Sequence, residues 1–112
     1  MKHEITLSKA VAMTRRYREH QLPNYPRSES FGIDDVKRLL SVAGVSALRI
    51  YYGLNENGEF CSILVAADAS GNNILPAQAD KLAGKPGDPV ILDDGIRCPP
   101  ICPKGGSLLD EG

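Results

Sequence analysis

The hydrophobic pattern is most informative in residues 47–67, where two largely apolar runs flank the polar stretch around Asn57-Gly58. The two flanking runs are rich in β-branched and aromatic residues, and Asn-Gly is a strong signal for a two-residue hairpin turn. The pattern predicts an antiparallel β-hairpin with Asn57 and Gly58 at the centre of a type I′ turn. This turn pairs Leu54 with Cys61 and sets the register of the whole hairpin. A four-residue loop, with Leu54 opposite Glu59, would leave the two faces unchanged.

In this register the hairpin has a core face and a second face, because side chains alternate along a strand. The expected core face contains Ile50, Tyr52, Ile63 and Val65. The second face contains Tyr51, Phe60 and Leu64 and is too apolar to be left to water. We therefore expect the second face to be covered by the rest of the chain or by a partner.

The first predicted helix covers residues 6–20, where apolar residues recur at helical spacing. Thr6 is a suitable N-cap, since its hydroxyl can accept a hydrogen bond from a free N–H of the first turn. Val11 lies on the apolar side of this helix. We expect it to pack against the core face of the hairpin.

The second predicted helix covers residues 33–43 and ends before Gly44. Its apolar side includes Val36, Leu39 and Leu40 at helical spacing. We expect Val36 and Leu40 to pack against the core face of the hairpin. Helix and hairpin together would form the main core.

After the hairpin, residues 73–75 predict a short third strand that ends at Pro76. Residues 76–112 contain six of the eight prolines and six of the eleven glycines, which predicts an irregular tail. A short strand or hairpin at 90–98 is an exception. The expected architecture is α+β: a domain at 1–75 in which two helices pack on a small antiparallel hairpin or meander, and a tail at 76–112.

Composition narrows the possible partners. Charged residues make up 24% of the 112 residues and hydrophobic residues 42%, which is ordinary for a globular protein. The formal net charge is −1, which disfavours nucleic acid as a partner. No apolar run reaches the roughly 18 residues of a membrane helix, so we expect no membrane association and a cytoplasmic location.

Arg15-Arg16-Tyr17-Arg18 is the most basic stretch of the chain. Arginines beside an aromatic ring can bind phosphate or a stacked base. On a helix, however, successive side chains point about 100° apart, so the arginines spread over the exposed side. A solvated helix face is the better interpretation.

The stretch Cys98-Pro99-Pro100-Ile101-Cys102 allows three kinds of chemistry. Its two thiols could provide half of a zinc site, but zinc pairs usually have two intervening residues and come as two pairs. They could also form a stabilising or regulatory disulfide. We favour two reduced, exposed cysteines in a rigid proline turn, and we expect Cys61 to be a small buried hydrophobe.

Several stretches resemble a group of small, uncharacterised bacterial proteins: TLSKAVAMTRRY at 6–17, LRIYYG at 48–53, ILP at 74–76 and LDDGIRCPPIC at 92–102. The resemblance spans most of the chain. No activity is attached to the group, so the resemblance implies no catalytic residue. It implies that the Cys-Pro stretch is a selected feature of the tail and not a frayed chain end.

No catalytic or phosphate-binding signature is present in the sequence. We therefore expect a non-catalytic interaction protein or accessory subunit without a cofactor, which binds a protein partner or forms a homo-oligomer. The expected interaction residues lie on the second sheet face and the tail: Tyr51, Phe60, Leu64, Val90, Ile91, Leu92, Ile96 and Ile101. The alternative is a thiol-redox or zinc-stabilised module that uses Cys98 and Cys102.

Overall fold

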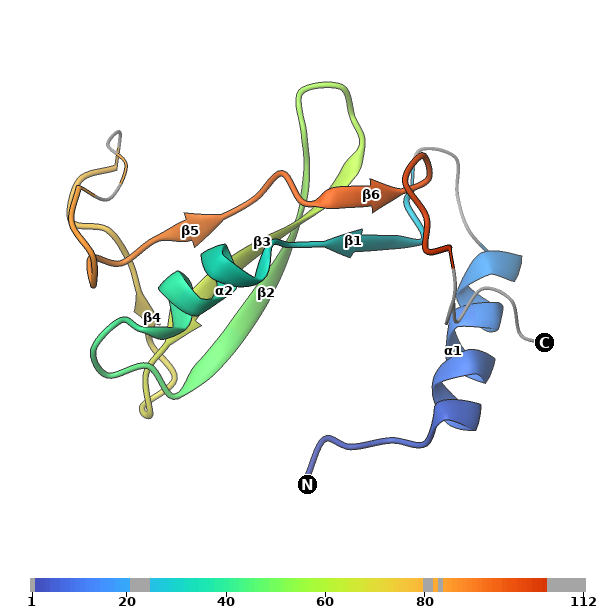
Figure 1. Ribbon diagram of the computed structural model, residues 1–112, viewed down its shortest axis with the longest axis horizontal. Helices are drawn as coiled ribbons and strands as arrows, with labels where there is room; N and C mark the ends of the chain where they lie inside the picture. The colour runs from blue at the N-terminus through green and yellow to red at the C-terminus, as the bar shows by residue number, and fades with distance from the viewer. Residues whose placement is uncertain (1, 21–24, 80–81, 83, 105–112) are drawn as a thin grey trace.

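The computed structural model describes residues 2–20, 25–79, 82 and 84–104, and its architecture is α+β, as predicted (Figure 1). Within these residues the strands form two antiparallel sheets, one of four strands and one of two. In chain order the elements are α1 (Leu7–Glu19), β1 (Ser28–Ser30), α2 (Ile33–Leu40), β2 (Ala47–Leu54), β3 (Phe60–Ala67), β4 (Asn73–Ile74), β5 (Ile91–Leu92) and β6 (Ile96–Cys98).

Strands β2 and β3 form the predicted hairpin, but the predicted register is wrong by one residue. Leu54 lies opposite Phe60 instead of Cys61, and Ile50 lies opposite Leu64 instead of Val65. Because side chains alternate along a strand, this shift changes which residues of β2 and β3 share a face. Ile50 now shares a face with Leu64.

The hairpin loop explains the shift. The Asn55 N–H donates to the Glu59 carbonyl at 2.9 Å, and the Gly58 N–H donates to the Asn55 carbonyl at 3.0 Å. Gly58 has a φ of 77°, whereas Asn57 is not among the residues with positive φ. The connection is therefore a three-residue loop that ends in a left-handed glycine, and not a type I′ turn.

The core forms on the sheet face that carries Leu64, which we expected to be the second face. Its members come from the helix, the sheet and the predicted tail: Leu39, Leu64, Ala66 and Val90, with Phe31, Val45, Ile74 and Leu92 packed around them. Of the expected core residues, Val65 is buried, but Ile50 and Tyr52 are 47% and 75% exposed. The predicted core face is therefore wrong.

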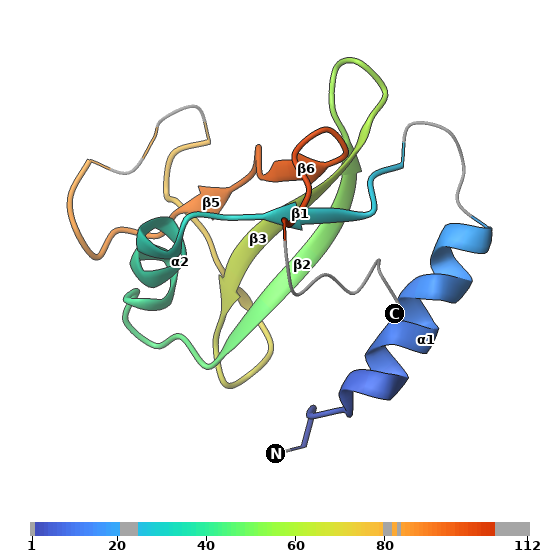
Figure 2. The same ribbon diagram turned by 45° about the vertical axis from the view of Figure 1, so that its right-hand side comes forward.

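Helix α2 packs on this face, while α1 lies at the opposite end of the molecule (Figures 1 and 2). Leu39 is fully buried and Leu40 is 44% exposed, so α2 contacts the sheet through Leu39 and not through Leu40 as expected. The helix ends at Leu40, earlier than predicted, and the chain turns at Gly44, which has a φ of 85°.

Helix α1 begins as predicted, because the Thr6 hydroxyl accepts a hydrogen bond from the Lys9 N–H at 3.1 Å. It contributes no buried side chain to the core, and Val11 is only partly buried. Its attachment to the described part of the chain includes the Tyr17 hydroxyl, which donates to the Pro26 carbonyl at 2.6 Å. Val11 is not among the side chains that form or surround the core cluster, so it does not join the core as expected.

Residues 90–98, which we assigned to the tail, complete both sheets. Strand β5 pairs with β3, and β6 pairs with β1. The two short strands therefore do not form a hairpin with each other, although only the three residues 93–95 separate them. The boundary predicted at residue 75 does not separate a domain from a tail, because Val90 is part of the core.

Candidate functional site

Strand β3 has hydrogen-bond partners on both of its edges. On one edge β4 and β5 pair with residues 64–67. Farther along the same edge, two side chains of the β1–β6 sheet bond to the backbone of β3 in place of a strand. Glu29 Oε1 accepts from the Ser62 N–H at 2.7 Å, and Arg97 Nε donates to the Phe60 carbonyl at 3.2 Å. The even-numbered residues of β3 therefore direct their backbone groups away from β2.

Among the described residues, strand β2 has a partner on one edge only. Hydrogen-bonded and non-hydrogen-bonded pairs alternate along an antiparallel ladder, and Asn55 bonds to Glu59 at its end. The odd-numbered residues of β2 therefore bond to β3, and the even-numbered ones direct their N–H and C=O groups outward. In the described part of the chain, no hydrogen bond reaches these outward groups.

The same even-numbered residues carry exposed apolar side chains. Leu48, Ile50, Tyr52 and Leu54 are 42%, 47%, 75% and 65% exposed. They lie on the face that α2 packs against, but α2 covers the β3 and β5 side of this face and leaves the β2 side open. We call these four residues, with their outward backbone groups, the β2 edge.

Natural edge strands usually carry a lysine, a proline or a bulge that prevents another strand from pairing. Strand β2 has none of these, and its only charged residue is Arg49. The Arg49 guanidinium is held on the other face, where Nη1 donates to the Gly71 carbonyl at 3.0 Å and to Asn73 Oδ1 at 2.6 Å. The β2 edge is therefore unprotected.

The eight expected interaction residues do not form one surface. Leu64 and Val90 are buried, and Leu92 and Phe60 are partly buried. The exposed members are divided between the sheet face opposite α2 and the β6 region: Tyr51, Ile91, Ile96 and Ile101. The β2 edge was missed, although the absence of charge at the even positions of 48–54 was a signal for it.

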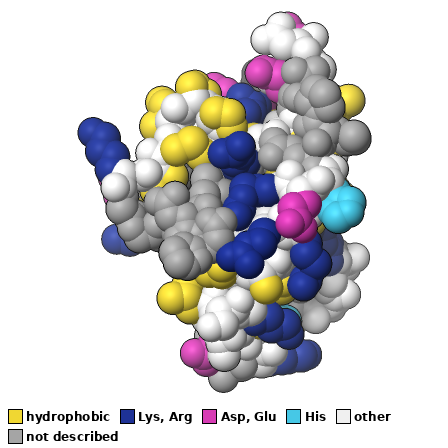
Figure 3. Space-filling view, turned by 90° about the vertical axis from the view of Figure 1, so that its right-hand side faces the viewer, with side chains coloured by type: hydrophobic (Ala, Val, Ile, Leu, Met, Phe, Trp, Pro, Cys, Tyr) yellow, Lys and Arg dark blue, Asp and Glu magenta, His cyan; other side chains and the backbone are white. Residues whose placement is uncertain are grey.

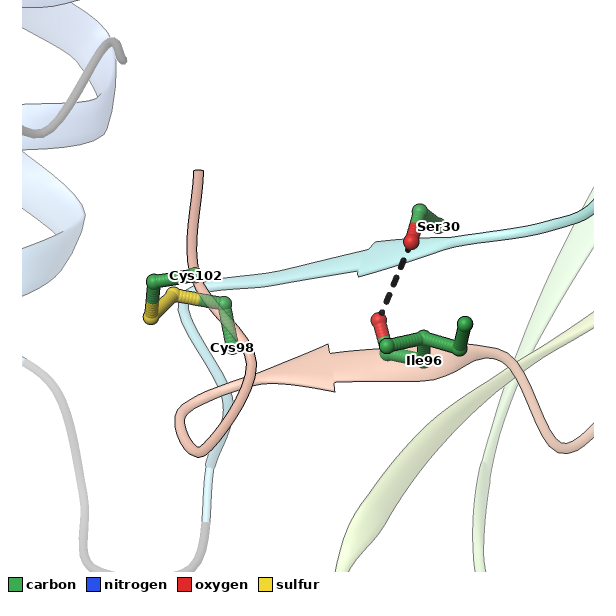
Figure 4. The surroundings of a disulfide bond; sticks show 4 residues. All are labelled: Ser30, Ile96, Cys98 and Cys102. Atoms are coloured by element: carbon green, nitrogen blue, oxygen red, sulfur yellow. Dashed lines mark hydrogen bonds between the residues drawn. A yellow bond between two sulfur atoms is a disulfide. The ribbon is translucent and has the colours of Figure 1, made fainter. Parts of the chain in front are cut away.

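Cys98 and Cys102 form a disulfide, so the favoured prediction of two reduced cysteines is wrong for this structure (Figure 4). The bond closes the loop that follows β6 (Figure 4). Cys98 is buried at the end of β6, while Cys102 is exposed. The expectation that both sulfurs are accessible is therefore also wrong for Cys98.

Cys61 is a free, buried cysteine. Burial raises the pKa of its thiol, and the carboxylates of Asp93 and Glu29 raise this pKa further, against a lowering effect of Arg97. A high thiol pKa keeps the sulfur protonated and unreactive at neutral pH. Cys61 is thus a structural residue, as the sequence predicts.

A cavity of about 410 Å³ lies where α1 meets β1 and β3. Aromatic side chains line much of it: Tyr17, Tyr25 and Phe60. Tyr25 stacks on Phe60 with ring centroids 5.2 Å apart, and Phe60 also stacks on Tyr52 at 5.8 Å. Burial raises the pKa of the Tyr17 hydroxyl, and nearby Tyr25 raises it further. The two ring contacts join the segment before β1 to the β2–β3 hairpin, and Tyr17 is the α1 side chain among the three that line the cavity.

Lys and Arg side chains gather on the face of the molecule that carries α1 (Figure 3). Lys9, Arg15 and Arg16 are exposed residues of this helix. An Asp or Glu and a His side chain lie next to the basic group (Figure 3). Arg15 and Arg16 thus lie on the solvated helix face that the sequence indicates, whereas Arg18 is partly buried.

No family model, curated protein or solved structure matches the chain. Within residues 2–20, 25–79, 82 and 84–104, no three His, Cys, Asp or Glu side chains come together as a metal site would require. Neither described helix is long and apolar enough to cross a membrane. The β2 edge is thus the feature from which a function can be argued.

Proposed function

We propose that this protein is a non-catalytic interaction protein that binds an extended strand of another polypeptide chain along the β2 edge. The observation that carries the proposal is that outward-facing backbone groups and exposed apolar side chains belong to the same four residues. In strand addition, main-chain hydrogen bonds provide affinity and alternate side chains provide specificity. The β2 edge offers both.

The proposed interaction surface differs from the one that the sequence predicts. Leu64, Val90 and Leu92 belong to the core and are not available to a partner. The predicted tail supports the interaction indirectly, because β5 and β6 complete the sheets and hold β3 in place. We retain the cytoplasm as the proposed location of this interaction.

Photo-crosslinking tests the proposal. A photoreactive phenylalanine derivative in place of Tyr52, which is 75% exposed, should form adducts with a bound polypeptide in cells. The same group in place of Leu7, which is 71% exposed on α1, is the matched control and should not form these adducts. Absence of adducts specific to position 52 would overturn the proposal.

Amide hydrogen exchange on the complex tests strand addition itself. The amides of Ile50 and Tyr52 face outward and should exchange more slowly when the partner is bound. The amides of Arg49 and Tyr51 already face β3 and should change little. Slowing that does not follow this alternation would mean that the partner binds in another way.

A thiol-redox module is the second candidate, and the Cys98–Cys102 disulfide favours it. Because Cys102 is exposed and Cys98 is buried, we propose that an external dithiol attacks Cys102. The new bond joins the dithiol sulfur to Cys102, and Cys98 leaves as a thiolate. The second thiol of the reductant then releases Cys102 and closes its own disulfide.

This candidate also bears on location, because the cytoplasm keeps most thiols reduced. A disulfide in that compartment would be a transient, reactive bond rather than a permanent brace. Incubation of the folded protein with a dithiol should reduce the Cys98–Cys102 bond, while Cys61 stays unmodified. Reduction only under denaturing conditions would exclude the redox role.

A further inference from the structure

The sequence of β2 is nearly symmetric about Tyr51. Leu48 and Leu54 are equally distant from this residue, and so are Ile50 and Tyr52. All four belong to the β2 edge. A strand with this symmetry is complementary to itself when it pairs in antiparallel orientation, because each apolar residue then meets another apolar residue.

We propose that the polypeptide bound at the β2 edge is a second copy of this chain, paired antiparallel about a two-fold axis at Tyr51. This inference rests on the proposed function, since it names the strand that the edge accepts. An isologous dimer uses the same surface on both copies, so residue i contacts residue j and residue j contacts residue i. The four-stranded sheets of the two copies would join into one continuous sheet.

The hydrogen-bonding pattern fits this pairing. The outward-facing groups belong to even-numbered residues, and the register about Tyr51 places Ile50 opposite Tyr52 and Leu48 opposite Leu54 of the other copy. Even-numbered residues thus oppose even-numbered residues, as an antiparallel hydrogen-bonded pair requires. Each such pair exchanges two bonds, so the four pairs provide about eight backbone hydrogen bonds.

Charge and size favour this register over its neighbours. Arg49 lies opposite Gly53 of the other copy, so its long side chain meets a residue without one and the two arginines stay apart. A slide of two residues in one direction brings Leu48 opposite the acidic Glu56. A slide of two residues in the other direction brings Leu54 opposite Ser46, whose N–H already donates to the Ala67 carbonyl at 2.8 Å. A slide of four residues in that direction brings Arg49 opposite Arg49, where like charges repel.

If the two copies pair in this register, opposite charges introduced at residues 48 and 54 should restore the self-association that either charge alone weakens. Leu48→Lys and Leu54→Glu each place a charge opposite a leucine and should weaken self-association at least about tenfold. In the double variant each introduced lysine faces an introduced glutamate of the other copy, and self-association should recover most of this loss. Positions 48 and 54 lie at opposite ends of β2, so the two charges cannot pair within one chain.

Sedimentation equilibrium of the purified full chain, over a wide range of protein concentration, measures the effect. The control Leu7→Lys changes a 71% exposed residue of α1 and should leave self-association unchanged. Circular dichroism should show that every variant has the same secondary structure. Slower exchange of the outward-facing β2 amides with rising concentration of the natural sequence should accompany the dimer.

Two results would overturn the inference: a monomer at every concentration, or a double variant that associates no better than the single variants. The proposed function is tested separately, by the crosslinking experiment at position 52. A monomeric protein whose position 52 still crosslinks to a different polypeptide would exclude the second copy and support strand addition by another partner. A monomer without such a crosslink would overturn both.

Discussion

Asn55 lies opposite Glu59 at the end of the hairpin, and its side chain holds the loop between them. Asn55 Oδ1 accepts hydrogen bonds from the N–H groups of Asn57 and Glu59, both at 2.9 Å, and Asn55 Nδ2 donates to Glu59 Oε1 at 2.9 Å. This pairing fixes a three-residue loop. Through the loop, one side chain determines which residues of β2 face outward.

The first prediction concerns this asparagine. Asn55→Ala removes the acceptor of two backbone N–H groups and should lower the free energy of unfolding by about 1–2 kcal/mol. Asn57→Ala is the matched control, because no described hydrogen bond involves the Asn57 side chain. Urea unfolding measures both. Equal losses would contradict the role assigned to Asn55.

The second prediction compares two leucines of the hairpin. Leu64 is 5% exposed and belongs to the core, whereas Leu54 is 65% exposed. Leu64→Ala should cost about 2–5 kcal/mol of unfolding free energy, because it leaves a cavity in the core. Leu54→Ala, the same chemical change at an exposed site, should cost far less. Similar losses in the two variants would show that the core face is assigned incorrectly.

The sequence predicts the α+β class, the start of α1 and the existence of the hairpin, because each depends on local signals. The predicted register is wrong because two local signals in the loop compete. Asn57-Gly58 favours a two-residue turn, but Asn55 and Glu59 stabilise a longer loop through side-chain bonds. Both faces of β3 carry apolar residues, so hydrophobic pattern alone could not show which of them lies beside Leu48, Ile50 and Tyr52.

The sequence pattern could not show that β2 is an edge strand, for a topological reason. Whether β2 is an edge strand depends on which strands lie beside β3, and those are β4 and β5. Strand β5 has only two residues, Ile91 and Leu92, and follows a region rich in proline and glycine. A strand this short has no detectable period, so it was assigned to a tail.

The third prediction concerns the thiols. Without reductant, the denatured protein should react with one equivalent of a thiol reagent, through Cys61, because Cys98 and Cys102 are joined. After reduction, three thiols should react. Mass spectrometry of the labelled protein counts them. Three labelled thiols without reductant would mean that the bond is absent from the purified protein.

The pKa of Cys61 gives the same experiment a pH dependence. Because burial and nearby carboxylates raise this pKa, the folded state holds the thiol proton more tightly than the unfolded chain does. Cys61 in the folded protein should therefore stay slow to alkylate up to and above the ordinary thiol pKa of about 8.5. As pH rises through this range, the unfolded state gains thiolate first, so folding stability should fall. Cys61→Ala should remove this part of the pH dependence.

The last prediction concerns Glu29, whose side chain bonds to the backbone of β3 where a neighbouring strand would otherwise pair. Glu29 Oε1 accepts from the Ser62 N–H at 2.7 Å, at the point where no described strand continues the ladder. Glu29→Ala leaves this N–H without its acceptor and should cost about 1–3 kcal/mol. The Ser62 amide should then exchange faster, which NMR-detected hydrogen exchange can measure.

Glu29→Gln is the control for this prediction, because it keeps an acceptor oxygen of the same reach for the Ser62 N–H. The other carboxylate oxygen, Oε2, is buried and has no hydrogen-bond partner among the described residues. Glu29→Gln replaces this oxygen by an NH2 group that is also unpaired but carries no charge. Because the bond to the Ser62 N–H is kept, Glu29→Gln should cost less than Glu29→Ala. Equal losses would mean that Glu29 acts through its negative charge and not as the acceptor that continues the ladder of β3.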